Sequence, residues 1–414
     1  MSVEPIVITG AGILASNGLG REAFWDALIH GRSGIRRIQR FDPSDLPCQI
    51  AGELWDFNPE DFMKKHDVRR WHRHVHQAVA AAKLAVDDAS FASAKYDPDR
   101  VAVAFGTSAG SPDEYYFTHR EAFETRGWKH IDRMASSATS AHAATANVSA
   151  EFKFRGPAAT FSSGCAVGLD LINWAAVQLR SGLADAAVVG ATEAPLTLLT
   201  LAATCSMGIL SSRNDEPEKA MRPFDRVSDG IVLSEGAGAI VVERLGHARA
   251  RGAPIFAEVV GYGTSTEGQN PLLIDKEGAA LARAIASALK EGGLAPQDID
   301  GAICHGVGIK MYDRSEVRAY KQVLGQHAYR LPISATKSMT GQPYSVGGIW
   351  SVGASLLTMA RGIVPPTINL EEPDPECDLD FVPMRVRYND IQTSLVTALS
   401  FGGNHSALVL RKMN

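Results

Sequence analysis

Short apolar runs bounded by glycine alternate with longer stretches whose apolar residues recur at helical spacing, and this alternation extends along the whole chain. The short runs are rich in valine, isoleucine and alanine, which is typical of buried strands. Predicted strands cover residues 6–9, 101–105, 186–190, 239–243, 257–260, 301–304 and 395–398. Predicted helices cover residues 21–30, 75–89, 166–180, 278–291 and 350–361. This order predicts an α/β protein with a mostly parallel sheet and helices on both faces.

The second half of the chain repeats the alternation of predicted strands and helices found in the first. A chain of 414 residues is too long for one ordinary hydrophobic core. A basic stretch that contains glycine and alanine, residues 247–254, separates the two similar halves. We therefore predict one half over residues 1–250 and a second over residues 251–414.

Charge and cysteine usage exclude several classes of protein. The formal net charge is −5, which argues against a protein that coats nucleic acid. No apolar stretch reaches the roughly 18 residues of a membrane span, and the first residues show no signal-peptide pattern. The five cysteines are widely spaced and include no Cys-x-x-Cys pair, so neither a disulfide framework nor a structural zinc site is predicted. We expect a cytoplasmic protein that binds neither nucleic acid nor membranes.

A glycine motif near the start matches a nucleotide-binding fingerprint. Gly10-Ala-Gly12-Ile-Leu-Ala15 follows a predicted strand and fits the pattern G-x-G-x-x-A. An acidic residue should then end a second strand about 20 residues later, but the basic loop of residues 31–40 stands there instead. A Tyr-x-x-x-Lys pair, typical of short-chain reductases, is also missing from the sequence. We favour a tight turn over a cofactor site.

The strongest local signal is Thr160-Phe-Ser-Ser-Gly-Cys165-Ala-Val-Gly168. A short strand turns sharply through Gly164, and a helix begins at or just after Cys165. A thiol at that position meets the positive end of the helix dipole, which favours thiolate, and free backbone N–H groups at the turn could hold an oxyanion. The alternative is a cysteine that fills the core, and we favour the nucleophile. Cys205 and Cys304 lie in apolar runs, where core filling is the better interpretation.

Further motifs follow Cys165 in a fixed order. They are Arg222-Pro-Phe-Asp-Arg-Val-Ser-Asp-Gly230 with Glu235-Gly-Ala-Gly238, then His305-Gly306, Ser334-Ala-Thr-Lys337-Ser-Met-Thr-Gly341, Pro365-Pro-Thr-Ile-Asn369 and Phe401-Gly-Gly403. With these motifs the chain resembles the β-ketoacyl acyl-carrier-protein synthases of the type I/II branch, in the thiolase-like superfamily, over essentially its whole length. The resemblance implies two thiolase-like α/β halves, each with a central mixed sheet, stacked in alternating helix and sheet layers so that helices form a shared middle layer. It also implies a dimer formed through the first half.

The resemblance also implies a reaction and a role for each matching residue. Such enzymes load an acyl group onto cysteine, bind a malonyl thioester on a carrier protein, and use its decarboxylation to generate the attacking carbanion. Cys165 matches the nucleophile, His305 the histidine that polarises the malonyl thioester oxygen, and Lys337 a lysine kept near the catalytic histidines. Phe401 matches the gatekeeping phenylalanine, whose backbone N–H would form the oxyanion hole with that of Cys165. No organic cofactor or metal is implied, because the phosphopantetheine arm arrives on the acyl carrier protein.

The chain departs from the family pattern at several positions. Gln342 replaces the second catalytic histidine, although its amide can still donate a hydrogen bond to a thioester oxygen, and a related branch uses asparagine there. Val307 and Ile309 replace two hydroxyl residues that meet the pantetheine arm, and Ser351 replaces a glutamate. The closing Gly-Phe-Gly-Gly-Thr-Asn becomes Ser400-Phe-Gly-Gly-Asn-His405, which should stiffen the gate loop. We expect all these changes in the half of the site that handles the malonyl donor, with the acyl-binding half intact.

These departures leave three functions open. The first is a decarboxylative condensation with an altered donor site, in fatty-acid or polyketide biosynthesis, and we favour it. The second is acyl transfer from Cys165 to another acceptor without decarboxylation. The third is a non-elongating partner subunit like the chain-length factors, although those partners typically lack the cysteine. Whether the dimer is a homodimer or a heterodimer with another ketosynthase-like subunit also stays open.

A basic segment precedes the second predicted helix. His72 and His76 fall on one helical face, as metal ligands can, but no carboxylate or cysteine completes a ligand set. The neighbouring basic residues are Lys64, Lys65, Arg69, Arg70 and Arg73. We predict a solvated basic face, and the resemblance adds the docking of an acidic carrier protein as its function. The docking residues would be Lys64, Lys65, Arg69 and Arg70.

Asp313 lies eight residues past His305, where the family often carries an acid. It could buttress the active-site loop, or it could cap the helix that runs through residues 317–324. We favour the cap.

Overall fold

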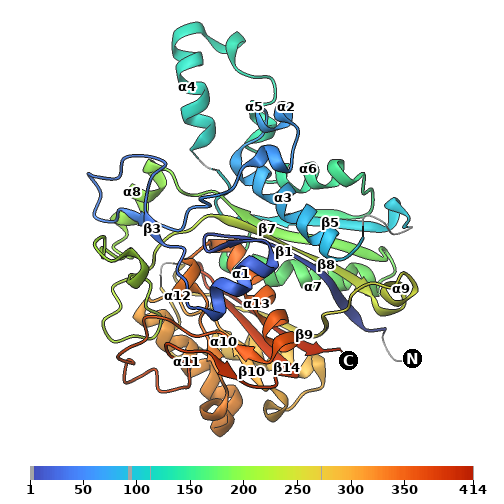
Figure 1. Cartoon of the computed structure of the whole chain (residues 1–414), viewed down its shortest axis with the longest axis vertical. Coiled ribbons are helices and arrows are strands. Elements are labelled where there is room, and N and C mark those ends of the chain that lie inside the picture. Colours follow the sequence, from blue (N-terminus) through green and yellow to red (C-terminus); the bar gives the residue numbers. More distant parts are fainter. Residues whose placement is uncertain (1–3, 92–95, 112, 272, 414) are drawn as a thin grey trace.

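Helix and sheet layers alternate through the molecule, with one pair of helices enclosed between the sheet layers (Figure 1). The computed structural model describes residues 4–91, 96–111, 113–271 and 273–413. Within these residues eleven strands form one sheet, whose order is β11-β10-β14-β15-β9-β1-β8-β7-β5-β6, with the short β2 (Gly18–Leu19) beside β1. The predicted α/β organisation is therefore confirmed.

The sheet consists of two halves with the same internal order. The first half contains β1 (Ile6–Ala15), β8 (Gly236–Arg244), β7 (Ala186–Glu193), β5 (Val101–Gly106) and β6 (Ala158–Phe161). The second contains β9 (Ala257–Thr266), β15 (Asn404–Lys412), β14 (Thr393–Leu399), β10 (Gly301–Ile303) and β11 (Ile333–Ser334). In each half the first two pairings are antiparallel and the last two are parallel. The halves meet where β1 pairs with β9, at Val7–Glu258 and Ile8–Ala257.

The mostly parallel sheet predicted from the apolar pattern is wrong, because the sheet is mixed, as the resemblance implies. The long strands β1, β8, β9 and β15 all pair antiparallel with one another or with their other neighbours. Their apolar runs resemble those of parallel strands because helices cover both faces. Burial on both faces, and not strand direction, is what the sequence pattern reports.

Two helices form the middle layer and two others cover the outside. α7 (Val167–Arg180) and α13 (Gly347–Arg361) pack on each other and on strands of both halves. α13 is buried from Gly347 to Met359, so it has almost no solvent-facing side. α3 (Arg73–Asp88) covers the first half, and α10 (Ala279–Gly292) covers the second. The middle helices thus hold the two halves in a fixed relation.

The remaining helices lie at the periphery or in connections between strands. They are α1 (Arg21–Ile29), α2 (Lys65–Val68), α4 (Glu114–Arg126), α5 (Ala135–Ala138), α6 (Ala143–Phe152), α8 (Leu198–Ser206), α9 (Leu245–Ala250), α11 (Lys310–Leu324) and α12 (Lys337–Thr340). α4 projects away from the layers at the top of Figure 1.

The glycine motif of residues 10–15 lies inside β1, so both the cofactor site and the tight turn are wrong for it. A Cβ at Gly10 or Gly12 would overlap backbone atoms of α3. The second half repeats this device, because a Cβ at Gly261 or Gly263 in β9 would overlap backbone atoms of α10. These glycines let the first strand of each half pack directly against its covering helix.

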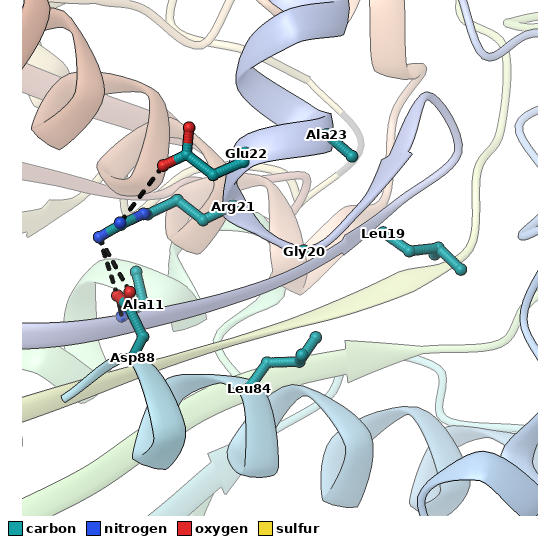
Figure 2. Close-up of a pocket in the computed structure, with 8 residues that line it drawn as sticks. All are labelled: Ala11, Leu19, Gly20, Arg21, Glu22, Ala23, Leu84 and Asp88. Carbon is teal, nitrogen blue, oxygen red and sulfur yellow. Dashed lines mark hydrogen bonds and ion pairs between the residues drawn. The ribbon is translucent and has the colours of Figure 1, made fainter. Parts of the chain in front are cut away.

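A surface hollow of about 330 Å³ lies beside the motif, lined by Ala11, Leu84 and the start of α1 (Figure 2). Its charged groups are already paired. Arg21 bonds Asp88 at 3.0 Å, and Asp88 also accepts the Ala11 N–H at 2.9 Å. The hollow therefore presents a closed ion pair where a pyrophosphate would need free N–H donors.

Candidate active site

Cys165 lies in a 3-10 turn, Gly164–Ala166, which runs directly into α7. This confirms the predicted strand–turn–helix, in which Gly164 adopts a positive φ of 66°. The thiol is 3% exposed. Burial raises its pKa to about 11, although the Lys337 charge opposes the shift. Burial thus opposes the thiolate that the start of a helix favours.

The amide of Gln342 faces the sulfur of Cys165. Its Nε2 lies 3.8 Å from Sγ, and the side chain is 1% exposed. The backbone of Gln342 is fixed to a neighbouring segment, since its N–H bonds the Val232 carbonyl at 2.8 Å and its carbonyl accepts the Ser234 N–H at 3.1 Å. Among the described residues, its buried Oε1 has no hydrogen-bond partner. Gln342, which we expect in place of a family histidine, is thus a fixed neutral donor.

His305 and Lys337 form a second buried pair. Lys337 Nζ donates to the His305 carbonyl at 2.7 Å and lies 3.4 Å from its Nδ1. Burial and the Lys337 charge hold the pKa of His305 well below its usual value, and burial also lowers the pKa of Lys337. The imidazole is therefore neutral at physiological pH and can donate or accept a proton. Because the Lys337 charge also lowers the pKa of Cys165, the lysine links the histidine to the thiol.

Two buried carboxyl groups shape the loop that carries His305. Glu316 accepts the N–H groups of His305 and Gly306 at 2.8 and 2.9 Å. Asp313 accepts those of Val307 and Gly308 at 3.0 and 3.2 Å. The predicted helix cap is wrong for Asp313. α11 begins at Lys310, and its first turn points Asp313 back at the loop, so Asp313 is a buttress of the active-site loop.

Phe401 and Ser400 approach Cys165 from the gate loop. The neighbouring Phe401 backbone and Ser400 side chain lower the pKa of the thiol, against the larger effect of burial. The Cys165 N–H itself donates to Ser400 Oγ at 2.9 Å. The expectation that every departure lies in the donor half is therefore wrong, because Ser400 contacts Cys165 directly.

The predicted solvated basic face is present at four exposed lysines and arginines, but it does not include the histidines. His72, His74 and His76 are 6%, 2% and 8% exposed, because they begin α3, whose inner side packs on the sheet. Arg73 bonds the buried Glu235 at 2.7 Å. Within the described residues, no group of histidines, cysteines and carboxylates could hold a metal ion. The predicted docking residues Lys64, Lys65, Arg69 and Arg70 are exposed, at and around α2.

Comparison with known proteins identifies the family. Residues 3–248 match the model of the β-ketoacyl synthase N-terminal domain, and residues 256–371 match that of the β-ketoacyl synthase C-terminal domain. The chain belongs to the β-ketoacyl synthase family. The resemblance read from the ordered motifs is thus confirmed.

Relatives of this family align along the whole chain. The 3-oxoacyl-acyl-carrier-protein synthase 2 of Coxiella burnetii is 36% identical over 413 residues, covering 100% of each chain. The tetracenomycin polyketide synthase ketoacyl synthase alpha subunit of Streptomyces glaucescens is 36% identical over 415 residues, covering 98% of this chain and 97% of that protein.

Solved structures of ketosynthases share the fold. The ishigamide ketosynthase/chain length factor superposes with a TM-score of 0.91 at 31% identity, with all of both chains covered. A type II polyketide synthase acyl-carrier protein in complex with its ketosynthase, bound to the hexaketide, gives 0.89 at 29% identity, again with both chains fully covered. The predicted thiolase-like fold is confirmed.

The other departures from the β-ketoacyl synthase pattern lie at different depths. Val307 is 1% exposed, and Ser351 lies buried in α13. Ile309 lines a hollow of about 280 Å³ at the surface, together with Gly208, Ser228 and Met311. The segment after His305 therefore leads from the buried pair to an apolar-sided opening.

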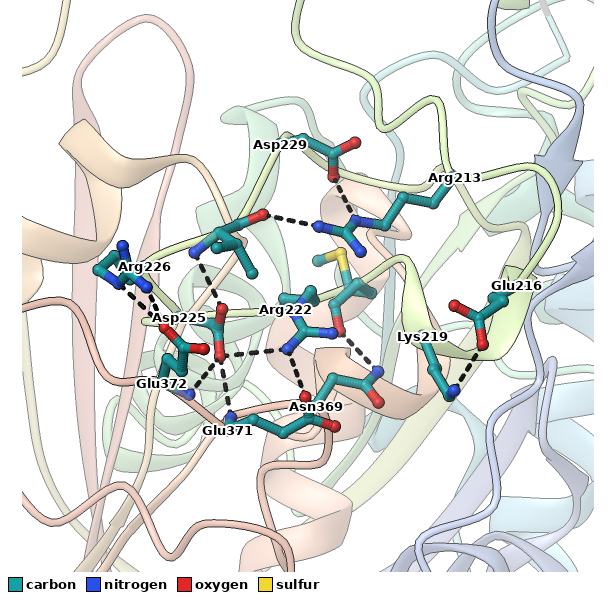
Figure 3. Close-up of polar contacts among 12 residues, drawn as sticks. Arg213, Glu216, Lys219, Arg222, Asp225, Arg226, Asp229, Asn369, Glu371 and Glu372 are labelled. Atoms are coloured by element: carbon teal, nitrogen blue, oxygen red, sulfur yellow. Dashed lines mark hydrogen bonds and ion pairs between the residues drawn. The ribbon is translucent and has the colours of Figure 1, made fainter.

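The Arg222–Gly230 motif of this ketosynthase braces the loops around that opening (Figure 3). Asp225 accepts the N–H groups of Glu371 and Glu372, both at 2.9 Å, and pairs with Arg222 at 3.3 Å. The Phe224 N–H donates to Asp313 at 2.8 Å, which connects the brace to the His305 loop. The motif therefore acts through backbone support of the site.

Sequence reasoning assigned no role to three groups that the structure brings into the site. Ser400 could have been found from its replacement of a family glycine, and Glu316 from its closeness in sequence to His305. Glu193 carried no signal. It is fully buried and accepts a hydrogen bond from Ser345 Oγ at 2.6 Å. Its charge raises the pKa of Cys165.

Proposed function

We propose that this chain is a condensing acyltransferase that extends an acyl group held on Cys165 by decarboxylative reaction with a malonyl thioester on an acyl carrier protein. The observation that carries the proposal is the Gln342 amide 3.8 Å from the Cys165 sulfur, in one buried cluster with the His305–Lys337 pair. A nucleophile and two neutral hydrogen-bond donors then meet at one place, as a thioester condensation requires.

The first half-reaction transfers the acyl group. The Cys165 sulfur attacks the thioester carbonyl of an acyl carrier, a new S–C bond forms, the bond to the carrier sulfur breaks, and the carrier thiol leaves with the cysteine proton. Because the resting thiol has a pKa of about 11, proton removal must accompany the attack. Backbone N–H groups of Cys165 and Phe401 would hold the developing oxyanion.

The second half-reaction forms the carbon–carbon bond. The malonyl carboxylate leaves as carbon dioxide, and its electron pair creates an enolate whose oxygen accepts hydrogen bonds from His305 and Gln342. The enolate carbon attacks the Cys165 thioester, and the cysteine sulfur leaves as a thiolate that takes up a proton from solvent. A buried amide and a neutral histidine suit this task, because each can donate a hydrogen bond to the enolate oxygen without changing its own protonation state.

The hollow at Ile309 suits the entry of the phosphopantetheine arm of the carrier. It begins at the segment that follows His305, and Ile309 in its wall stands where the family pattern has a hydroxyl residue. The exposed Lys64, Lys65, Arg69 and Arg70 would steer an acidic carrier protein toward the chain. The arm belongs to the substrate, so we propose that no organic cofactor is needed. We place this activity in the cytoplasm, where the free thiols of all five cysteines persist.

A dimer through the first half is supported by two surfaces. β6 ends the sheet on that side, with Ala158 exposed, and an uncovered edge strand invites pairing. The α4 region presents Phe123 and Trp128 at 58% and 71% exposure. The partner is a second copy or another ketosynthase-like subunit, and the mass of the purified complex separates the two.

A second candidate is acyl transfer from Cys165 to a different acceptor. The apolar Val307 and Ile309 favour it, because they remove polar contacts from the donor side while Cys165 remains. A non-elongating partner subunit would not need the cysteine.

The test measures two events with the purified chain. Intact-protein mass spectrometry after incubation with acyl carriers reports acylation, and carbon dioxide release from malonyl carrier reports decarboxylation. We expect both, and Cys165→Ala should abolish the first. Acylation without carbon dioxide supports transfer to another acceptor. If neither event occurs and a second synthase copurifies, the chain is a partner subunit and the proposal fails.

A further inference from the structure

Ser400 fills the place where the family has glycine at the entrance of the gate loop. The residue is 1% exposed, and its backbone is fixed in a tight turn by the bond from its N–H to the Asn404 carbonyl at 2.9 Å. Its hydroxyl has two partners. It accepts the Cys165 N–H at 2.9 Å and donates to the Phe401 carbonyl at 2.9 Å.

The N–H that Ser400 accepts is one of the two donors expected to stabilise the oxyanion on the acyl carbonyl. A buried N–H must have an acceptor, and here a side chain of the protein already supplies it. The fit is close, because a Cβ on Gly164 would overlap Ser400 Oγ. An incoming thioester oxygen can therefore use this donor only after the hydroxyl has left it.

We propose that Ser400 is a positioning residue whose hydroxyl occupies the oxyanion hole of the free protein and must rotate away before Cys165 is acylated. The inference rests on the proposed function, since it concerns acyl loading. The exchange replaces one neutral hydrogen bond by another to the same N–H, so the hydroxyl competes with the substrate oxygen. An alanine at this position leaves the N–H free and removes the competition.

The test compares two reagents on the same thiol. Iodoacetamide alkylates the sulfur without needing an oxyanion hole, whereas the N-acetylcysteamine thioester of hexanoate acylates it and needs one. For Ser400→Ala, the ratio of the acylation rate to the alkylation rate should rise roughly two- to tenfold, the range for release of one neutral hydrogen bond. Ser400→Thr restores a hydroxyl and should return the ratio toward that of the native chain. Ser355→Ala is the control for losing a buried hydroxyl away from the site, since Ser355 Oγ bonds Ser394 Oγ at 2.8 Å. In this variant the ratio of the acylation rate to the alkylation rate should not change.

An unchanged or lower ratio in Ser400→Ala would overturn the inference, because the hydroxyl would then support the thiol or the hole and not compete. The pH dependence of alkylation reports any change in the thiol itself, since the Ser400 side chain lowers the pKa of Cys165. That pKa should rise in Ser400→Ala and stay unchanged in Ser355→Ala.

Failure of the proposed function has a different signature, in which every variant is alkylated and none, including the native chain, accepts an acyl group. In that case the binding of hexanal tests the role of Ser400. Hexanal adds reversibly to the Cys165 sulfur without a leaving group, and the addition places an oxygen at the N–H donors of the oxyanion hole. Tighter hexanal binding by Ser400→Ala than by the native chain supports the competing hydroxyl, and equal or weaker binding rejects it.

Discussion

At the scale of single residues, Gln342 is the amide that we expect to act in place of a family histidine. A histidine in this position would be buried and its protonation would depend on pH, whereas an amide keeps its two N–H donors at every pH. Its fixed backbone and 1% exposure mean that the donor is positioned before substrate arrives. The neighbouring His305, with its lowered pKa, is then the titratable member of the pair.

We therefore expect Gln342→Leu to reduce carbon dioxide release from malonyl carrier by about 100-fold, the usual effect of losing one oxyanion donor. Gln342→His should be tolerated or should raise decarboxylation, and its rate should acquire a further pH dependence from the added imidazole. Carbon dioxide release measured between pH 5.5 and 8.5 checks both variants. A complete collapse of activity in Gln342→His would show that glutamine has a role of its own.

Asp313 makes a prediction about pH. Burial raises its pKa from 3.8 to about 7. A carboxyl whose pKa is higher in the folded than in the unfolded chain stabilises the fold most below the unfolded pKa, and this contribution is lost as the pH rises through the folded one. Asp313→Asn removes the titration. The native chain should therefore lose more of its stability than Asp313→Asn, so that the difference between their free energies of unfolding shrinks from pH 5 to pH 8.

Urea denaturation of the two proteins at both pH values measures this difference. If Asp313→Asn instead became less stable than the native chain as the pH rises, the folded protein would prefer the ionised carboxylate. The N–H groups of Phe224, Val307 and Gly308 would then hold it. Lys65→Gln is a suitable surface control, since that side chain is exposed.

At the scale of elements, the first strand and covering helix of each half make the same close contact. Gly10 and Gly12 lie against α3 as Gly261 and Gly263 lie against α10. The two contacts replace side-chain packing by backbone approach, which fixes the helix at short distance from the strand.

Gly12→Ala and Gly263→Ala should therefore destabilise the fold by similar amounts, on the order of 1–3 kcal/mol each. Denaturant midpoints measure the effect. Gly246→Ala in α9 is the matched control, because its Cβ would meet the end of the flexible Glu4 side chain, 2.7 Å away, and no backbone atom. It should be neutral within about 0.5 kcal/mol. A loss confined to one half would show that the two contacts are not equivalent.

At the scale of the whole molecule, the exposed aromatic residues of the α4 region lie on the half that we expect to dimerise. Phe123→Lys together with Trp128→Lys should shift the sedimentation of the protein toward the monomer, because each places a charge where an apolar contact is expected. Tyr388→Lys is the control, since that ring is 77% exposed on β13 (Arg387–Tyr388) of the other half. An unchanged sedimentation profile for the double variant would place the interface elsewhere.

The family and the α/β order could be predicted because they rest on motifs and on periodicity, both of which are local in sequence. The predicted elements are found with shifted ends, as with β1, which continues through the glycine motif to Ala15. What could not be predicted depends on contacts between distant segments. Ser400 and Cys165 are 235 positions apart, and Asp313 turns inward because Phe224 needs an acceptor. The resting charge of Cys165 follows from burial, which no local pattern reports.

The two ends of the described chain flank a single residue at the centre of the sheet. Val7 in β1 and Arg411 in β15 both stand opposite Glu258 in β9, so they are two strand spacings apart, about 10 Å. A linker of a few residues could therefore join the present ends, and a new opening could be made between α9 and β9. Such a circular permutant would begin with the half that carries His305 and deliver the cysteine last, yet keep every strand pairing of the native sheet. The order in which the two halves leave the ribosome is thus separable from the architecture that they build.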